Sequence, residues 1–176
     1  MSVDPAATVE IELVEYDESW PTLYEREATR ITDALGERAL LVEHVGSTAV
    51  PGLAAKPRID IVLVVGDTRD EDRYVADLER AGYVLRIREP DWHEHRLFKD
   101  TAPDVNLHVF SQGCSEVGRM IRFRDHLRVD ERDRLLYERT KRELATRRWG
   151  SVQDYADAKT SVVDEISERA AVRGSS

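Results

Sequence analysis

The sequence predicts an α/β (α+β) fold, with a mixed β-sheet flanked by helices and a C-terminal part that is all helical. Two apolar runs rich in β-branched residues, at 39–45 and 59–65, are typical of buried strands. Beyond residue 113 the apolar positions recur at helical spacing and no strand pattern returns. A chain of 176 residues has the usual size of one domain, so we expect both parts to belong to a single domain.

Local signals define the N-terminal elements. Residues 9–16 begin with alternating apolar and acidic side chains, which suits a short edge strand or an extended lead-in. A helix is expected over 20–35, because Pro21 is favoured in a first turn and the apolar residues fall near one face. Gly36 would end this helix, since glycine suits the residue after a helix C-terminus.

The middle of the chain predicts one helix followed by further strands. Residues 70–81 have helical spacing, and Gly82 stops that pattern before an apolar strand at 83–87. Residues 97–110 are expected to form a hairpin around the turn-rich segment 99–104.

The last third of the chain predicts three helices, over 116–127, 130–147 and 151–171. We therefore divide the chain into an α/β part at 1–113, C-terminal helices at 114–172 and a loose tail at 173–176.

Composition excludes several classes of protein. The net charge of -9 argues against general nucleic-acid binding, because neutralising phosphates requires a basic face. Cys114 is the single cysteine, so no intramolecular disulfide can form and a reducing cytoplasm suits the chain. The first residues lack an export signal, and no stretch approaches the roughly 20 apolar residues that span a bilayer. We interpret the chain as a cytoplasmic protein without a membrane partner.

The most informative segment, residues 44–63, joins the two buried strands. Gly46 lets a ligand approach the backbone, and Ser47 and Thr48 offer hydroxyl and N–H groups to a phosphate. Asp60 lies inside an apolar strand, where a lone carboxylate is costly to bury without a metal, a base or hydrogen-bond donors. The segment therefore indicates a binding site for a phosphate.

A simpler interpretation is also open. A Gly-Ser turn is a common connection, and a strand aspartate can bond to nearby backbone amides. The combination favours a site, because Lys56 lies between the turn and Asp60, and Pro51 and Pro57 stiffen a loop that need not be stiff to join two strands.

The stretch from Glu43 to Asp60, EHVGSTAVPGLAAKPRID, resembles the signature of the GrpB family. The likeness continues through 106–110, 122–128, 137–141 and 155–159, and so covers nearly all of the chain from about Val14 onward. GrpB proteins are similar in turn to the nucleotidyltransferase superfamily. The resemblance therefore implies a nucleotidyltransferase-like mixed sheet flanked by helices.

The resemblance also implies roles for individual residues. Gly46 and Ser47 would face nucleotide phosphates, and Asp60 would be the first metal-binding carboxylate. In that superfamily a second carboxylate stands two residues later on the same sheet face, often with a third on a neighbouring strand. Here position 62 is valine and the candidate on the later strand is His108, so the usual two-metal set is incomplete.

We expect at most one divalent ion, Mg²⁺ or a transition metal, bound by Asp60 and His108. His44, His95 or Glu43 would be nearby, and imidazole ligands would favour a transition metal. His108 could equally be a satisfied core histidine, because apolar residues flank it. His93, two residues before His95, is expected in an exposed polar loop.

Cationic side chains supply further candidates for phosphate binding, namely Lys56, Arg96, Arg122, Arg124, Lys141 and Lys159. Arginine forks suit phosphates, although a run of charges is usually a solvated helix face. Lysine is scarce here, with four among 26 basic residues, which draws attention to each of them. Lys141 and Lys159 each lie four residues after a tyrosine on one helical face, and those tyrosines could equally be core anchors.

Two functions fit these residues. The first is a GrpB-type transferase that binds a nucleoside triphosphate and a divalent metal and passes a nucleotidyl group to a small acceptor, with Asp60 and His108 as catalytic residues. The second is a non-catalytic nucleotide-binding or accessory module, for example linked to coenzyme A metabolism, and Val62 favours it. A scaffold with a satisfied polar core ranks last. The nucleobase, the acceptor and the oligomeric state are left open.

Overall fold

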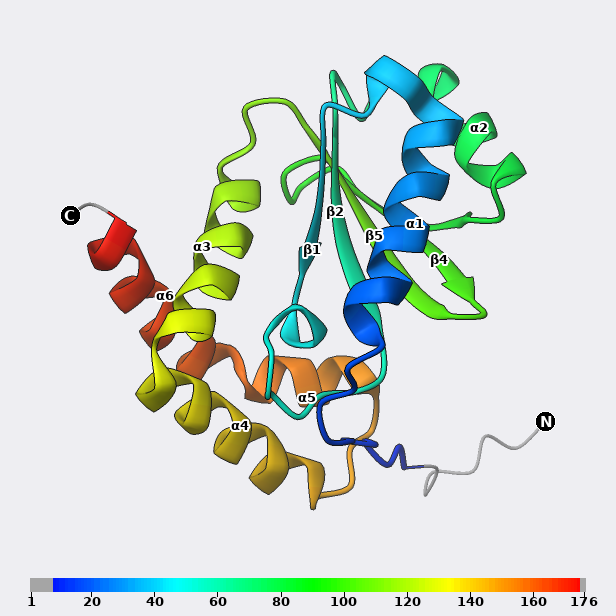
Figure 1. The fold of residues 1–176 in the computed structure, drawn as a ribbon. Helices are drawn as coiled ribbons and strands as arrows, with labels where there is room; N and C mark the ends of the chain where they lie inside the picture. The colour runs from blue at the N-terminus through cyan, green and yellow to red at the C-terminus, as the bar shows by residue number, and fades with distance from the viewer. Residues whose placement is uncertain (1–7, 175–176) are drawn as a thin grey trace.

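The computed structural model describes residues 8–174 and is built around a five-stranded sheet in the order β1-β2-β5-β4-β3 (Figure 1). The strands span Leu41–Val45 (β1), Ile59–Val65 (β2), Val84–Glu89 (β3), His95–Thr101 (β4) and Asp104–Ser111 (β5). β2 and β5 run parallel, whereas the other three neighbouring pairs are antiparallel. The sheet is therefore mixed, as predicted.

Helices α1 (Trp20–Leu35) and α2 (Val75–Arg80) cover one face of this sheet (Figure 1). Ile31 of α1 and Leu78 of α2 join Ile61 and Leu107 in the main apolar cluster. Because successive strand residues point to opposite faces, Asp60, which precedes Ile61, is directed to the other face.

The C-terminal helices lie on that other side of the sheet (Figure 1). They are α3 (Ser115–Val129), α4 (Glu131–Ala145), α5 (Val152–Ala158) and α6 (Thr160–Gly174). Val117 of α3 packs on Val62 of β2. Val50 and Leu53, from the loop that follows the Gly-Ser turn, pack into a cluster with residues of α3, α4 and α6. The helical part therefore holds this loop in place beside the sheet.

Most of the predicted elements are confirmed. α1 and β2 have the predicted bounds, and the other strands are shifted by a few residues. The hairpin is longer than expected, because residues 99–101 and Asp104 pair across the ladder and leave Ala102 and Pro103 as the turn. The lead-in at 9–16 is extended, with isolated bridges from Val9 and Val14.

Other predictions need correction. The helix expected at 70–81 is a 3₁₀ turn at Glu71–Arg73 followed by the shorter α2. The single helix expected at 151–171 is two helices that meet at Lys159. Tyr155 of α5 and Ile166 of α6 pack into different apolar clusters, and the change of direction at Lys159 lets both be buried. α6 also continues through Arg173 to Gly174, where we expected a loose tail, while 175–176 lie outside the described residues.

A membrane-spanning helix is not found within residues 8–174, where every helix is too short or too polar to cross a bilayer.

Candidate functional site

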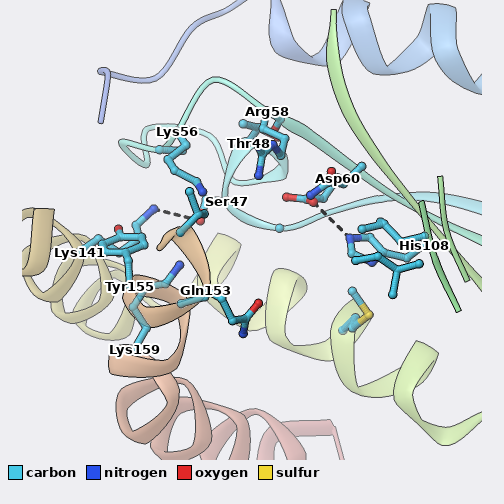
Figure 2. Close-up of a pocket in the computed structure, with 18 of the residues that line it drawn as sticks. Ser47, Thr48, Lys56, Arg58, Asp60, His108, Lys141, Gln153, Tyr155 and Lys159 are labelled. Atoms are coloured by element: carbon cyan, nitrogen blue, oxygen red, sulfur yellow. Dashed lines mark hydrogen bonds and ion pairs between the residues drawn. The ribbon is translucent and has the colours of Figure 1, made fainter. Parts of the chain in front are cut away.

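A pocket of about 430 Å³ lies where the sheet meets the Gly-Ser turn, the following loop and helices α4 and α5. Figure 2 shows Asp60 and His108 on one side of this pocket and Lys141, Tyr155 and Lys159 on the other. The sheet part and the helical part thus both contribute to one site, at positions far apart in the sequence.

The Gly-Ser turn packs directly against Asp60. Gly46 has a φ of 75° and a ψ of -174°, a backbone conformation that essentially only glycine adopts. A Cβ atom at this position would lie 2.7 Å from Oδ2 of Asp60, which is closer than real contacts allow. Ser47 follows at the start of the 3₁₀ turn Ser47–Ala49 (η2). Glycine at position 46 therefore lets the turn approach the carboxylate.

Three of the four lysines converge on this pocket, and we call Lys56, Lys141 and Lys159 the lysine cluster. Nζ of Lys141 donates to Oγ of Ser47 at 2.9 Å and to the carbonyl oxygen of Ala54 at 2.6 Å. The Nζ atoms of Lys159 and Lys56 lie 4.6 and 5.9 Å from the centre of the Tyr155 ring. In the described part of the chain, no lysine of the cluster forms a salt bridge.

Burial makes these ammonium groups easier to deprotonate. Burial, followed by the charge of Lys159, lowers the pKa of Lys141 to about 7. Burial and the neighbouring Arg58 lower the pKa of Lys56 to about 8. Burial also lowers the pKa of Lys159, although the charge of Asp60 opposes this shift. The protein stabilises the three charges poorly, so a bound anion would stabilise them.

Four side chains form a hydrogen-bonded chain from Asp60 to the rim of the pocket. Nε2 of His108 lies 3.2 Å from Oδ1 of Asp60, and Nδ1 of His108 lies 3.1 Å from Nε2 of His95. Nδ1 of His95 lies 2.9 Å from Oε1 of Glu89. Burial would raise the pKa of Asp60, but its hydrogen bond with His108 and the nearby cationic groups lower it. Asp60 is therefore a carboxylate at neutral pH.

Val62 stands where the superfamily pattern has a second carboxylate, and it is fully buried. Its side chain packs with Val45, Phe110 and Val117 in the cluster beneath α3. Its neighbour on β5 is His108. Val62 is thus part of the packing between the sheet and α3.

The side chains present do not complete the metal site that we expected. Asp60 and His108 are adjacent but bond to each other, and Nε2 of His95 faces His108. His44 is bonded to Thr48 instead. Mg²⁺ favours octahedral oxygen ligands and catalytic zinc sites have three protein ligands, so two adjacent donors do not fit either ion. A divalent ion here would need further ligands from a bound molecule.

Comparison with known proteins identifies the family. The family model described as GrpB protein matches residues 10–169. The chain belongs to the GrpB family. The resemblance seen between Glu43 and Asp60 is thereby confirmed.

Individual relatives of this GrpB chain agree with the assignment. A UPF0157 protein of Halalkalibacterium halodurans is 62% identical over 160 residues, which cover 91% of this chain and 82% of the relative. The crystal structure of the conserved protein GrpB from Enterococcus faecalis aligns with a TM-score of 0.82 and 28% identity, over 94% of this chain and 100% of that one. A dephospho-CoA kinase of Mycolicibacterium paratuberculosis is 30% identical in an alignment that covers 90% of this chain and 46% of the kinase.

Two predicted site residues of this GrpB chain, His44 and Arg124, brace β1 and do not line the pocket. Nε2 of His44 lies 2.9 Å from Oγ1 of Thr48, and its ring stacks on Tyr24 at 4.8 Å. Arg124 donates to Oε2 of Glu43 at 2.5 Å and to the carbonyl oxygen of His44 at 2.9 Å. Thr48 does line the pocket, but its hydroxyl is already committed to a backbone carbonyl.

Arg96 and Arg122 also lie outside the pocket, contrary to our expectation. Arg96 follows His95 on β4, and alternation along the strand directs it to the opposite face, where it pairs with Glu71 and Glu94. Arg122 is exposed on α3 and borders a surface hollow next to α6. His93 is exposed in the turn between β3 and β4, as predicted.

Several residues of the pocket wall were not predicted from the sequence, among them Tyr155, Glu89 and Trp92. Tyr155, considered only as a core anchor, lies beneath two lysines of the cluster. Glu89 ends the hydrogen-bonded chain, and Trp92 lies at the rim. The only local signal for Trp92 was a large aromatic residue in a polar turn, and Glu89 had no local signal because its partner is on another strand.

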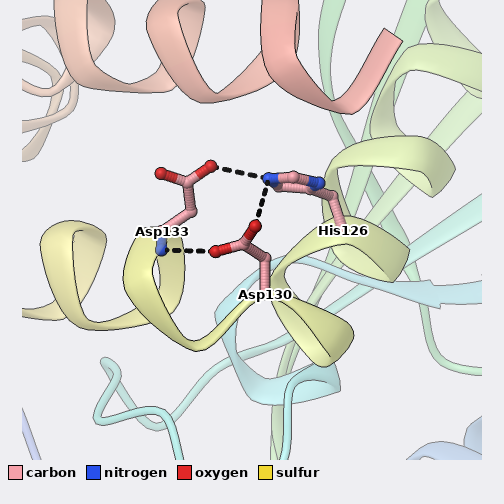
Figure 3. A group of neighbouring side chains, drawn as sticks. All are labelled: His126, Asp130 and Asp133. Carbon is pink, nitrogen blue, oxygen red and sulfur yellow. Dashed lines mark hydrogen bonds and ion pairs between the residues drawn. The ribbon is translucent and has the colours of Figure 1, made fainter. Parts of the chain in front are cut away.

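A second cluster of ionisable side chains lies at the junction of α3, α4 and α6. Figure 3 shows His126 facing Asp130 and Asp133, three residues close enough to share an ion. Arg169 donates to both carboxylate oxygens of Asp133, at 2.8 and 2.5 Å, and Arg173 donates to Asp130 at 2.9 Å. The two arginines already neutralise these carboxylates, so the cluster joins helices together.

Proposed function

We propose that this GrpB chain binds the phosphate groups of a nucleotide at the lysine cluster and transfers a nucleotidyl group from it to a small acceptor. The observation that carries the proposal is the convergence of three lysines, none with a salt bridge in residues 8–174, beside Ser47 in a chain of net charge -9. Unpaired cations that meet in a pocket of an acidic protein favour a compact, highly charged anion.

The lysines occupy positions suited to a chain of phosphates. Lys56 comes from the loop after the Gly-Ser turn, Lys141 from α4 and Lys159 from the junction of α5 and α6. Lys141 also fixes the hydroxyl of Ser47 at the edge of the pocket. A triphosphate bound here would lie beside Asp60, because Gly46, next to Ser47, packs so close to this carboxylate that a Cβ atom on it would lie 2.7 Å from Oδ2.

The transfer step would use the paired Asp60 and His108. The acceptor hydroxyl oxygen bonds to the α-phosphorus while the bond from that phosphorus to the leaving diphosphate breaks. The hydroxyl proton passes to the carboxylate of Asp60, whose Oδ1 also bonds to Nε2 of His108 at 3.2 Å. The lysine cluster stabilises the charge that accumulates on the diphosphate as it leaves.

A second function, a nucleotide-binding accessory module without transfer, is favoured by Val62. A fully buried valine in place of a second carboxylate removes a ligand that two-metal transfer requires. The similarity to part of a dephospho-CoA kinase adds support for an accessory role in coenzyme A metabolism. Both functions need the lysine cluster, and they differ in whether diphosphate is released.

Titration calorimetry with ATP, tripolyphosphate and adenosine tests the proposal. Binding of ATP and tripolyphosphate with no binding of adenosine is expected, and failure of both phosphate compounds to bind would overturn it. Diphosphate release in the presence of ATP and a small-alcohol mixture then separates the two functions. Asp60→Asn is expected to keep ATP binding and abolish release; ATP binding without release by the unaltered protein would favour the accessory module.

A further inference from the structure

The sheet face that carries Asp60 is only partly covered by helix. α3 packs over β1 and β2 and over Phe110, where Val62 and Val117 meet. Toward β3 the face is open, and Ile87 remains 44% exposed. Apolar surface is thus left uncovered on the side of the pocket away from the lysines.

This apolar surface leads directly to His108. Ile87 of β3 is the register partner of Leu97 of β4, and Leu97 is the register partner of His108 of β5. Partners in register point to the same face, and neighbouring strands lie about 4.8 Å apart, so Ile87 lies roughly 10 Å from His108. All three side chains line the same pocket as the lysine cluster.

Trp92 forms the wall next to this row. Its ring makes edge contacts with His95 at 5.1 Å and Phe110 at 5.9 Å, yet it stays 42% exposed. The next two residues, His93 and Glu94, have φ values of 55° and 49°, a conformation that is uncommon for residues other than glycine. Backbone strain of this kind concentrates at functional sites, and here it occurs in the turn that presents the indole to the pocket.

From these observations we infer that Ile87, Leu97 and Trp92 form an acceptor subsite for a small molecule with one aromatic ring and a hydroxyl group. The inference rests on the proposed function and specifies its acceptor. The ring packs on Ile87 and Leu97 with its edge or face toward Trp92, and a linker of one or two carbons brings the hydroxyl to His108. An anionic acceptor would place its charge against this apolar wall without a cationic partner.

NMR titration of the full chain with 2-phenylethanol tests the inference, with ethanol as the probe that lacks the ring. The indole N–H signal of Trp92, assigned by its loss in Trp92→Phe, is expected to shift in a saturable way with 2-phenylethanol and to remain in place with ethanol. Absence of a saturable shift would overturn the inference.

A matched pair of variants on β3 locates the binding. Ile87→Asp is expected to weaken 2-phenylethanol binding at least about tenfold, because it puts a charge into the apolar wall. Val84→Asp, on the same strand with 45% exposure and outside the pocket lining, is expected to bind as the unaltered protein does. Equal binding by both variants would contradict the subsite. ATP binding that persists in Ile87→Asp separates a failure here from a failure of the proposed function.

Discussion

Nζ of Lys141 lies 2.9 Å from Oγ of Ser47, although 94 residues separate them in the chain. The same ammonium group donates to the carbonyl oxygen of Ala54, so α4 is fixed at two points to the loop that carries the Gly-Ser turn. The helical part therefore completes the pocket that begins in the sheet part.

ATP binding at pH 8 is expected to take up protons. Lys141 and Lys56, with pKa values of about 7 and about 8, are partly neutral at this pH, and a bound polyphosphate would raise both values. Calorimetry in two buffers of different ionisation enthalpy should therefore show uptake of about one proton for each ATP bound. Lys56→Met should reduce this proton uptake. Identical binding enthalpies in the two buffers would show that no proton is taken up.

Replacement of Gly46 by alanine is expected to destabilise the protein more than replacement of Gly52. Both residues have a positive φ, of 75° and 81°, which strains an alanine by roughly 1–3 kcal/mol. A Cβ at position 46 also clashes with Asp60, whereas a Cβ at position 52 meets nothing within 4 Å. Urea unfolding should show a lower free energy of unfolding for Gly46→Ala; equal losses would show that the close approach to Asp60 is unimportant.

Introducing the missing carboxylate with Val62→Asp is expected to damage the fold without creating a metal site. The side chain would be buried among Val45, Phe110 and Val117, and an unpaired buried carboxylate costs about 3 kcal/mol or more. Val62→Thr, of similar shape, should lose less stability. Stable Val62→Asp protein with tight Mg²⁺ binding by calorimetry would refute this account of the position.

Stability is expected to fall in acid as Asp133 becomes protonated. Hydrogen bonds from Arg169, then from His126, lower the pKa of Asp133 to about 2 in the folded state, although burial opposes the shift. Because the folded value is below the unfolded value of about 4, the stabilisation is complete above pH 4 and is lost between about pH 4 and pH 2. This contribution to the free energy of unfolding amounts to about 2 kcal/mol at neutral pH.

Urea unfolding as a function of pH checks this contribution. Asp133→Asn should lose the stability at neutral pH and show a flatter profile between pH 4 and 2. Glu165→Gln removes a more exposed carboxylate that also contacts Arg169, and should leave the profile nearly unchanged. If the free energy of unfolding depended on pH in the same way for the unaltered protein and for Asp133→Asn, another group would be responsible for the loss of stability in acid.

Elements defined by local signals were predictable from the sequence. The amphipathic spacing and flanking residues of α1, and the β-branched run of β2, gave exact bounds. The break at Lys159 was not predictable, because Lys159 itself keeps a helical backbone conformation. The change of direction depends on which apolar clusters bury Tyr155 and Ile166.

The pocket was predictable in part for a related reason. Lys56, Asp60 and the Gly-Ser turn belong to one segment, and the scarcity of lysine drew attention to Lys141 and Lys159. Arg122 and Arg124 could not be assigned, since the orientation of α3 about its axis is set by tertiary packing. Arg96 could have been excluded: it is adjacent to His95 on a strand, so the two side chains must face opposite sides.

The affinity for ATP of two lysine variants tests whether the lysine cluster binds phosphate. Lys159 belongs to the lysine cluster, whereas Lys99, the remaining lysine of the chain, lies outside the pocket lining. Calorimetry should show that Lys159→Met weakens ATP binding about tenfold or more, as expected for loss of a charge-assisted contact, while Lys99→Met binds ATP as the unaltered protein does. Equal affinities for the two variants would show that the lysine cluster is not the phosphate site.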